Sequence, residues 1–143
     1  MQSPNWSTVT ESELWEYIAW HLSANGVDSV LVGGAVVSVY SDGIYKSGDL
    51  DIVYTSYNSS IGEDYQIIPD VKRVSGKMIK ILSPTDCIKD RLASYIYFNA
   101  RECLEQAILV AKRQSFNLKE IKRWCDSEGG KAKSAFEEFK NLL

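Results

Sequence analysis

Two short motifs constrain the fold more than any other feature of this chain: Val32-Gly33-Gly34 and Gly48-Asp49-Leu50-Asp51. Residues 27–32 are a β-branched run, which predicts a strand that ends in the glycine pair. The polar residues around Gly43 close a short helix that we expect over residues 35–41. Residues 50–54 predict a second strand that opens with the two aspartates. The sequence therefore predicts a strand–helix–strand unit with glycines at one joint and carboxylates at the other.

The spacing of the two aspartates carries the chemistry. Side chains at positions i and i+2 of a strand point to the same face, so Asp49 and Asp51 project together while Leu50 and Ile52 face the core. Two carboxylates that close repel each other by about 4 kcal/mol at 4 Å and an effective dielectric of about 20. A divalent cation with oxygen ligands offsets that repulsion. The aspartate pair therefore indicates a metal site.

The glycine pair favours a phosphate next to that metal. A glycine at the end of a strand lets the backbone approach a phosphate closely and directs the N–H groups of the next helix toward it. Taken alone, Gly33-Gly34 also suits a tight strand–helix turn, and two acidic residues at the start of a strand are often only solvated. Their combination in this order is more specific, and we interpret it as a metal-dependent phosphate site.

Composition and length fit a single α+β domain over residues 1–143. The chain has 143 residues, 45% of them hydrophobic and 24% charged, which is enough to bury a sizeable core. We expect a mixed sheet with helices packed on it over residues 1–83 and a helical part over residues 84–143. No apolar run approaches the roughly 20 residues that span a bilayer, so we expect no membrane association.

A cytoplasmic location is expected from the N-terminus and the cysteines. The first residues lack both the basic region and the apolar stretch of a secretory signal. The cysteines are odd in number and show no CxxC spacing, which predicts reduced, buried thiols and disfavours a zinc site. They are Cys87, Cys103 and Cys125.

Local signals place the remaining elements. Thr10 followed by Glu13 predicts a capping box at the start of a first helix that ends near Gly26. Ser83-Pro84 and Asn117 predict the starts of two later helices. The other expected elements are strands over 65–68, 71–75 and 77–82, and helices over 84–97, 100–113, 118–126 and 132–142. The aromatic residues on these helices are expected mainly in the core; they include Trp15, Trp20, Trp124, Tyr95, Tyr97 and Phe98.

Charge is unevenly distributed although the net charge is only −3. Residues 1–71 hold ten acidic side chains and one basic side chain, whereas residues 72–91 hold six basic and two acidic ones. An acidic site that faces a basic strip would suit a complex of a metal with a triphosphate. The alternative is that most of these lysines and arginines lie on solvated faces.

The chain resembles the polymerase-β-like nucleotidyltransferase superfamily. The resemblance rests on an apolar residue and two glycines after one strand, then Asp-x-Asp on the next, and it covers residues 27–54 best. It implies transfer of a nucleotidyl group from a nucleoside triphosphate, with Mg²⁺ or Mn²⁺ held by Asp49 and Asp51. The phosphates would lie against Gly33, Gly34 and Ser38. Ser47 occupies a position where many members have Ser or Thr.

The resemblance also implies candidate site residues in the helical part, residues 84–143. Many members carry a third carboxylate on a later strand, where this chain has Lys80. Small members of the abortive-infection type are similar further on, with a helix bearing Lys or Arg followed by an acidic segment. By that comparison Lys89 and Arg91 would meet the triphosphate, unless they only pair with Asp86 and Asp90 on a surface helix. The third carboxylate would be Glu102 or Glu105, with Asp70 as a weaker substitute.

Three functions therefore remain open from sequence. The leading interpretation is a nucleotidyltransferase that moves a nucleoside monophosphate to an unidentified acceptor, which can be RNA, protein or a small molecule. The second is a nucleotide- or partner-binding module of the same fold with weak or no catalysis. The third is an interaction domain in which Asp49-Leu50-Asp51 is only a surface turn. The tryptophan-rich first helix and the C-terminal helices can bury themselves or pair with a second copy in a homodimer.

Overall fold

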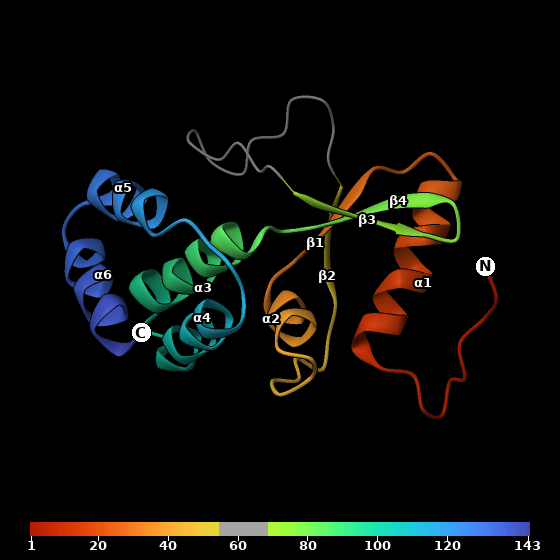
Figure 1. The fold of residues 1–143 in the computed structure, drawn as a ribbon, viewed down its shortest axis with the longest axis horizontal. Helices are drawn as coiled ribbons and strands as arrows, with labels where there is room; N and C mark the ends of the chain where they lie inside the picture. The colour runs from red at the N-terminus through yellow and green to blue at the C-terminus, as the bar shows by residue number, and fades with distance from the viewer. Residues whose placement is uncertain (55–68) are drawn as a thin grey trace.

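The structure, a computed structural model, describes residues 1–54 and 69–143. The expected α+β class is confirmed, because these residues form six helices and a four-stranded mixed sheet. The predicted strand over 65–68 lies outside the described residues. In Figure 1 the later helices gather at one end of the molecule and the first helix lies at the other.

The sheet brings together four short strands in the order β2-β1-β4-β3. Their bounds are β1 Ser29–Val32, β2 Asp51–Tyr54, β3 Asp70–Val74 and β4 Lys77–Ile81. The outer pairs, β1 with β2 and β3 with β4, are antiparallel, whereas the central pair β1 and β4 is parallel. Four strand ends therefore lie together at one edge of the sheet, the edge formed by strand ends and not by an outer strand. They are the last residues of β1 and β4 and the first residues of β2 and β3. Both motifs are at this edge.

Three helices begin at the signals read from the sequence. Helix α1 (Glu11–Ala24) has the complete capping box, in which the Glu13 amide donates to Thr10 Oγ1 and the Thr10 amide donates to Glu13 Oε2. Ser83 caps α3 (Pro84–Phe98), and Asn117 caps α5 (Leu118–Glu128). These caps satisfy amides that have no partner within the helix, so a local signal is enough to locate the start.

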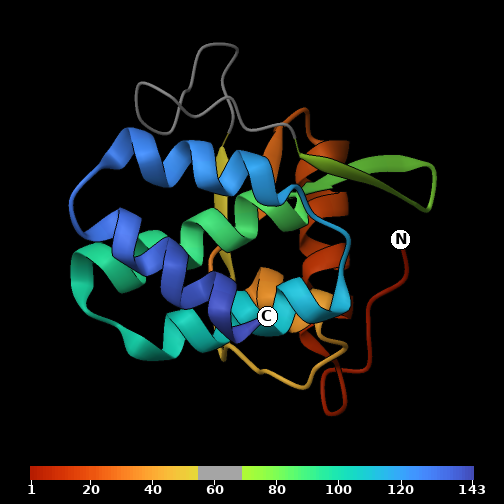
Figure 2. The same cartoon turned by 60° about the vertical axis from the view of Figure 1, so that its left-hand side comes forward.

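The helices pack in two groups. Helix α1 lies along β1 and β4, and the short helix α2 (Gly34–Tyr40) packs against α1, β1 and α4 and so links the two groups. Helix α3 packs against α4 (Arg101–Arg113), α5 and α6 (Lys131–Leu142). Figure 2 shows these last four helices grouped together, with the β3–β4 hairpin projecting to one side of them. No helix among the described residues is long and apolar enough to cross a membrane.

A single cluster of buried apolar side chains includes residues from both groups. Trp15 and Trp124 are buried as expected. Tyr97 and Phe98 are not, since they are 56% and 82% exposed. They stand in the last turn of α3, where Asn99 adopts a left-handed conformation and ends the helix at the surface. The expectation of a core role for these two side chains is therefore wrong.

Candidate functional site

The two motifs lie side by side, where β1 ends and β2 begins. Val32, the last residue of β1, pairs with Asp51, the first residue of β2. Gly33 and the start of α2 follow immediately, so the glycine turn and the aspartates lie side by side (Figure 1). The antiparallel pairing of β1 with β2 is what brings together residues that lie well apart in the sequence.

Side chains of the aspartate loop occupy the space beside both glycines, Asp51 beside Gly33 and Ser47 beside Gly34. A Cβ on Gly33 would lie 2.6 Å from Asp51 Oδ2, and a Cβ on Gly34 would lie 2.9 Å from Ser47 Oγ. Gly33 also has φ +73° and ψ −156°, a backbone region that is almost restricted to glycine. The glycine pair therefore lets the carboxylate of Asp51 and the hydroxyl of Ser47 approach the strand–helix turn.

Asp49 is oriented by its own loop. Ser47 Oγ donates a hydrogen bond of 2.8 Å to Asp49 Oδ1. Gly48, between them, has φ +83°. Both Asp49 and Asp51 are exposed. The loop thus presents two carboxylates to solvent, one held by a serine hydroxyl and the other beside a glycine.

The first turn of α1 reaches the same loop. Glu11 Oε1 accepts a hydrogen bond of 2.9 Å from the amide of Gly48. Burial raises the pKa of the Glu11 carboxyl, but the amides of Gly48 and Ser47 and the hydroxyl of Ser38 outweigh it and hold that pKa below its usual value. Glu11 therefore remains a carboxylate at neutral pH. Sequence reasoning missed this residue, because nothing local connects α1 with a loop 37 positions later.

Ser38 lies behind the loop. Its side chain is 5% exposed, and its hydroxyl interacts with Glu11. It also forms part of the wall of a cleft of about 770 Å³ between the start of α1, α2 and the loop, together with Thr10 and Lys46. The structure thus places Ser38 next to Glu11.

The aspartate pair suits a hard divalent cation. Two carboxylates of like charge stand two positions apart, and within residues 1–54 and 69–143 neither forms an ion pair with Lys or Arg. Carboxylate oxygens are the ligands that Mg²⁺ and Mn²⁺ prefer. Over the same residues, no group of three His, Cys, Asp or Glu side chains is close enough to hold a metal. The described residues therefore fit a metal site to which the protein supplies two carboxylate ligands.

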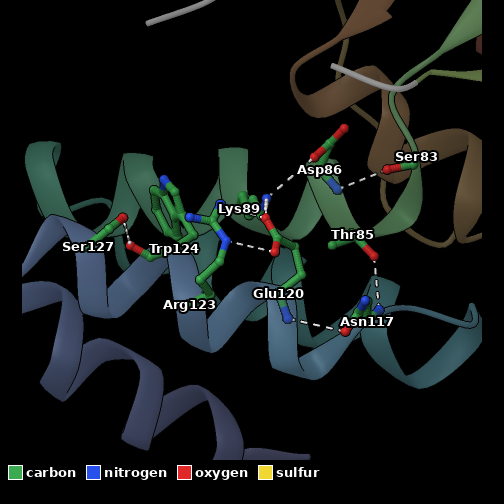
Figure 3. Close-up of polar contacts among 9 residues, drawn as sticks. All are labelled: Ser83, Thr85, Asp86, Lys89, Asn117, Glu120, Arg123, Trp124 and Ser127. Atoms are coloured by element: carbon green, nitrogen blue, oxygen red, sulfur yellow. Dashed lines mark hydrogen bonds and ion pairs between the residues drawn. The ribbon is translucent and has the colours of Figure 1, made fainter. Parts of the chain in front are cut away.

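Lys89 points toward α5 and is buried, not solvated. Figure 3 shows its ammonium group between Asp86 and Glu120. Lys89 Nζ lies 2.8 Å from Glu120 Oε1 and 3.8 Å from Asp86 Oδ1, and the residue is only 6% exposed. Arg123 also binds Glu120, and bonds from Arg123 and Lys89 lower the pKa of Glu120 to about 2. The alternative of a surface position is therefore wrong for Lys89, whose pairing with Asp86 is nonetheless observed.

Arg91 faces α4. Its guanidinium group donates to Asp90 Oδ2 at 2.6 and 3.0 Å and to Gln106 Oε1 at 3.3 Å. Burial lowers the pKa of Arg91, but Asp90 outweighs it and the net pKa is raised. Arg91 thus joins α3 to α4. Its guanidinium group is already bound by the carboxylate of Asp90 and the side-chain amide of Gln106.

The structure does not bring the predicted third carboxylates to the aspartate pair. Glu102 and Glu105 are exposed in the first turns of α4, whereas it is the other end of this helix that touches α2, through Gln114 and Tyr40. Glu105 precedes Gln114 by about 13 Å of helix. Asp70 begins β3, and three strand-to-strand steps of about 4.8 Å, or about 14 Å, separate β3 from β2. Asp70 is therefore too far from Asp51 for one metal ion to bridge them, and among the described residues no third His, Cys, Asp or Glu side chain joins the pair in a group that could hold a metal.

Fold and site together define a class: an α+β protein whose mixed sheet holds an exposed aspartate pair against a glycine turn. No family model, curated protein or solved structure matches this chain.

Proposed function

We propose that this chain is a metal-dependent nucleotidyltransferase that moves a nucleoside monophosphate from a nucleoside triphosphate to the hydroxyl, amine or phosphate of an acceptor. The observation that carries the proposal is the contact between the two motifs. Asp51 lies against Gly33 so closely that a Cβ would not fit, while Asp49, two residues earlier, accepts a hydrogen bond from Ser47. A surface turn with no function requires neither this close approach nor the bond that orients Asp49.

Each residue of the site has a role in this proposal. Asp49 and Asp51 hold Mg²⁺ or Mn²⁺, and Gly33 and Gly34 form the turn against which the phosphates lie. When bound, the metal neutralises charge that builds on the leaving pyrophosphate. Lys89 would contact the triphosphate only in exchange for its bonds to Glu120 and Asp86. The acceptor is unidentified.

A specific observation favours a second candidate function. Among the described residues no third His, Cys, Asp or Glu side chain lies close enough to hold a metal together with the pair, and Glu102 and Glu105 lie on an exposed stretch of α4. Catalysis with two metal ions generally needs further carboxylate ligands. A module that binds a metal–nucleotide complex but catalyses weakly or not at all would retain the same site.

The three free and buried cysteines support a cytoplasmic location, which we include in the proposal. Burial raises the pKa of the Cys87 thiol well above its usual value, so this residue stays a protonated, unreactive thiol. Such thiols are typical of proteins in a reducing compartment.

The test is calorimetric titration of the full chain with each of the four nucleoside triphosphates, with and without Mg²⁺. Wild type is compared with Asp49→Asn and Asp51→Asn, and Asp126→Asn is the matched control because it removes one carboxylate from the surface of α5. Metal-dependent binding that only the site variants lose is the expected result. Absence of binding by the folded wild-type protein would reject the proposal and leave an interaction domain.

A pyrophosphate-release assay then separates the two candidates. Release by wild type that both site variants lose identifies a transferase. Tight metal–nucleotide binding without release, across candidate acceptors that include RNA, protein and small hydroxyl compounds, identifies the binding module.

A further inference from the structure

Glu11, in the first turn of α1, accepts a hydrogen bond from the backbone of the aspartate loop. The residue is half-buried, and its Oε1 atom accepts from the Gly48 amide at 2.9 Å. Its other oxygen, Oε2, is also shielded from solvent. A carboxylate that loses its hydrogen bonds to water needs other donors in their place. Backbone amides supply them as charge-assisted hydrogen bonds.

The contact acts on Asp49 through two short steps. Gly48 has φ +83°, a conformation that a free loop need not maintain. Holding the Gly48 amide also holds the residues on either side of it, and one of these, Ser47, donates to Asp49 Oδ1 at 2.8 Å. A path of hydrogen bonds thus leads from α1 to the carboxylate that faces solvent. The helix is anchored in turn by the buried side chain of Trp15.

We propose that Glu11 is a positioning residue, which fixes the Ser47-Gly48-Asp49 loop so that Asp49 and Asp51 bind a divalent cation together. This inference rests on the proposed function, because it assumes that the aspartate pair binds metal. Glu11 itself does not ligate the metal; its carboxylate is directed at the Gly48 amide. Residues that orient metal ligands in this way typically change metal affinity by about 10- to 100-fold when they are removed.

Two variants of Glu11 separate position from charge. Glu11→Ala removes both the acceptor oxygen and the negative charge. Glu11→Gln removes the charge but keeps a carbonyl oxygen that can accept from Gly48. Glu16→Gln is the matched control, because it also removes a carboxylate from α1. The Glu16 carboxylate pairs with Lys72 on β3 and not with the aspartate loop.

The experiment measures two quantities on each full-length variant. One is the affinity for Mn²⁺ alone, followed by the loss of the free-ion electron paramagnetic resonance signal. The other is hydrogen exchange of the Gly48 amide in the metal-free protein, followed by NMR. We expect Glu11→Ala to weaken Mn²⁺ binding by about tenfold or more and to speed exchange at Gly48. We expect Glu11→Gln to stay closer to wild type in both, and Glu16→Gln to match wild type.

The results distinguish the two proposals. Wild type that binds Mn²⁺, with Glu11→Ala binding equally well, overturns the role of Glu11 and leaves the metal site intact. Equal weakening by Glu11→Gln and Glu11→Ala also overturns it, because the charge alone would then account for the effect. Failure of wild type to bind Mn²⁺, with a slowly exchanging Gly48 amide, rejects the metal site and the positioning role that depends on it.

Discussion

The close approach of Asp51 to Gly33 leads to a prediction about stability that does not depend on function. Gly33→Ala adds a Cβ 2.6 Å from Asp51 Oδ2 and 3.3 Å from Asp51 Cβ, at a residue with φ +73°. Two costs follow. The backbone conformation costs a non-glycine residue about 1–3 kcal/mol, and forcing an extra carbon against its neighbour costs about another 1–3 kcal/mol. We expect a total loss of about 2–6 kcal/mol in the free energy of unfolding.

Two other glycines allow the costs to be measured separately. Gly26 has φ +76° with no atom near the added Cβ, so Gly26→Ala reports backbone strain alone. Gly34 lacks a positive φ but would place its Cβ 2.9 Å from Ser47 Oγ, so Gly34→Ala reports contact alone. We expect Gly26→Ala to cost about 1 kcal/mol. Gly34→Ala should change stability little, because a side chain can move and alanine favours the helix by about 0.5–1 kcal/mol.

The assay is urea unfolding followed by tryptophan fluorescence, since Trp15 and Trp124 are buried. A loss of 3 kcal/mol lowers the midpoint by about 1.5 M at a typical slope of about 2 kcal/mol/M. The decisive measurement is a double-mutant cycle with Asp51→Ala, which removes the carboxylate that the new Cβ meets. Gly33→Ala should cost at least about 1 kcal/mol less in that background. An equal cost in both backgrounds, or a cost no greater than that of Gly26→Ala, would refute the reasoning.

Three further predictions concern parts of the molecule away from this contact. Because the folded-state pKa of Glu120 is lowered to about 2 from 4.5, its stabilising effect is complete above pH 4.5 and is lost as the pH falls toward 2. Glu120→Gln should therefore flatten the decrease in urea midpoint over that pH window, and an unchanged slope would contradict the role of Glu120 beside Lys89. Thr10→Ala removes the cap of α1 and should lower the free energy of unfolding by about 1 kcal/mol in the same assay. The three cysteines are buried, and burial raises the pKa of each thiol, to about 11 for Cys125, so a thiol reagent at pH 8 should label the native protein far more slowly than the protein in urea. Rapid labelling of the native protein would show that the helices around Cys125 open readily.

The sequence determined the local elements of this protein because their causes are local. The cap at Thr10, the Ser83-Pro84 start and the Asn117 cap each satisfy backbone amides within one turn, so α1, α3 and α5 begin where these residues predict. The alternation around Asp49 and Asp51 predicted that both carboxylates avoid the core, and both are exposed, although only Asp51 belongs to β2 and Asp49 precedes the strand. The α+β class follows from the order of these elements.

Strand order and helix packing were decided only by the tertiary structure. The order β2-β1-β4-β3 separates Asp70 from Asp51. The residues of these two strands do not by themselves predict that order. Arg91 and Glu102 were placed by which face of α3 meets α4, and Lys89 by the position of α5 (Figure 3). The contact of Glu11 with Gly48 joins elements 37 residues apart. Such contacts depend on how buried surfaces fit together across the whole chain, whereas sequence patterns report only on neighbours a few residues apart.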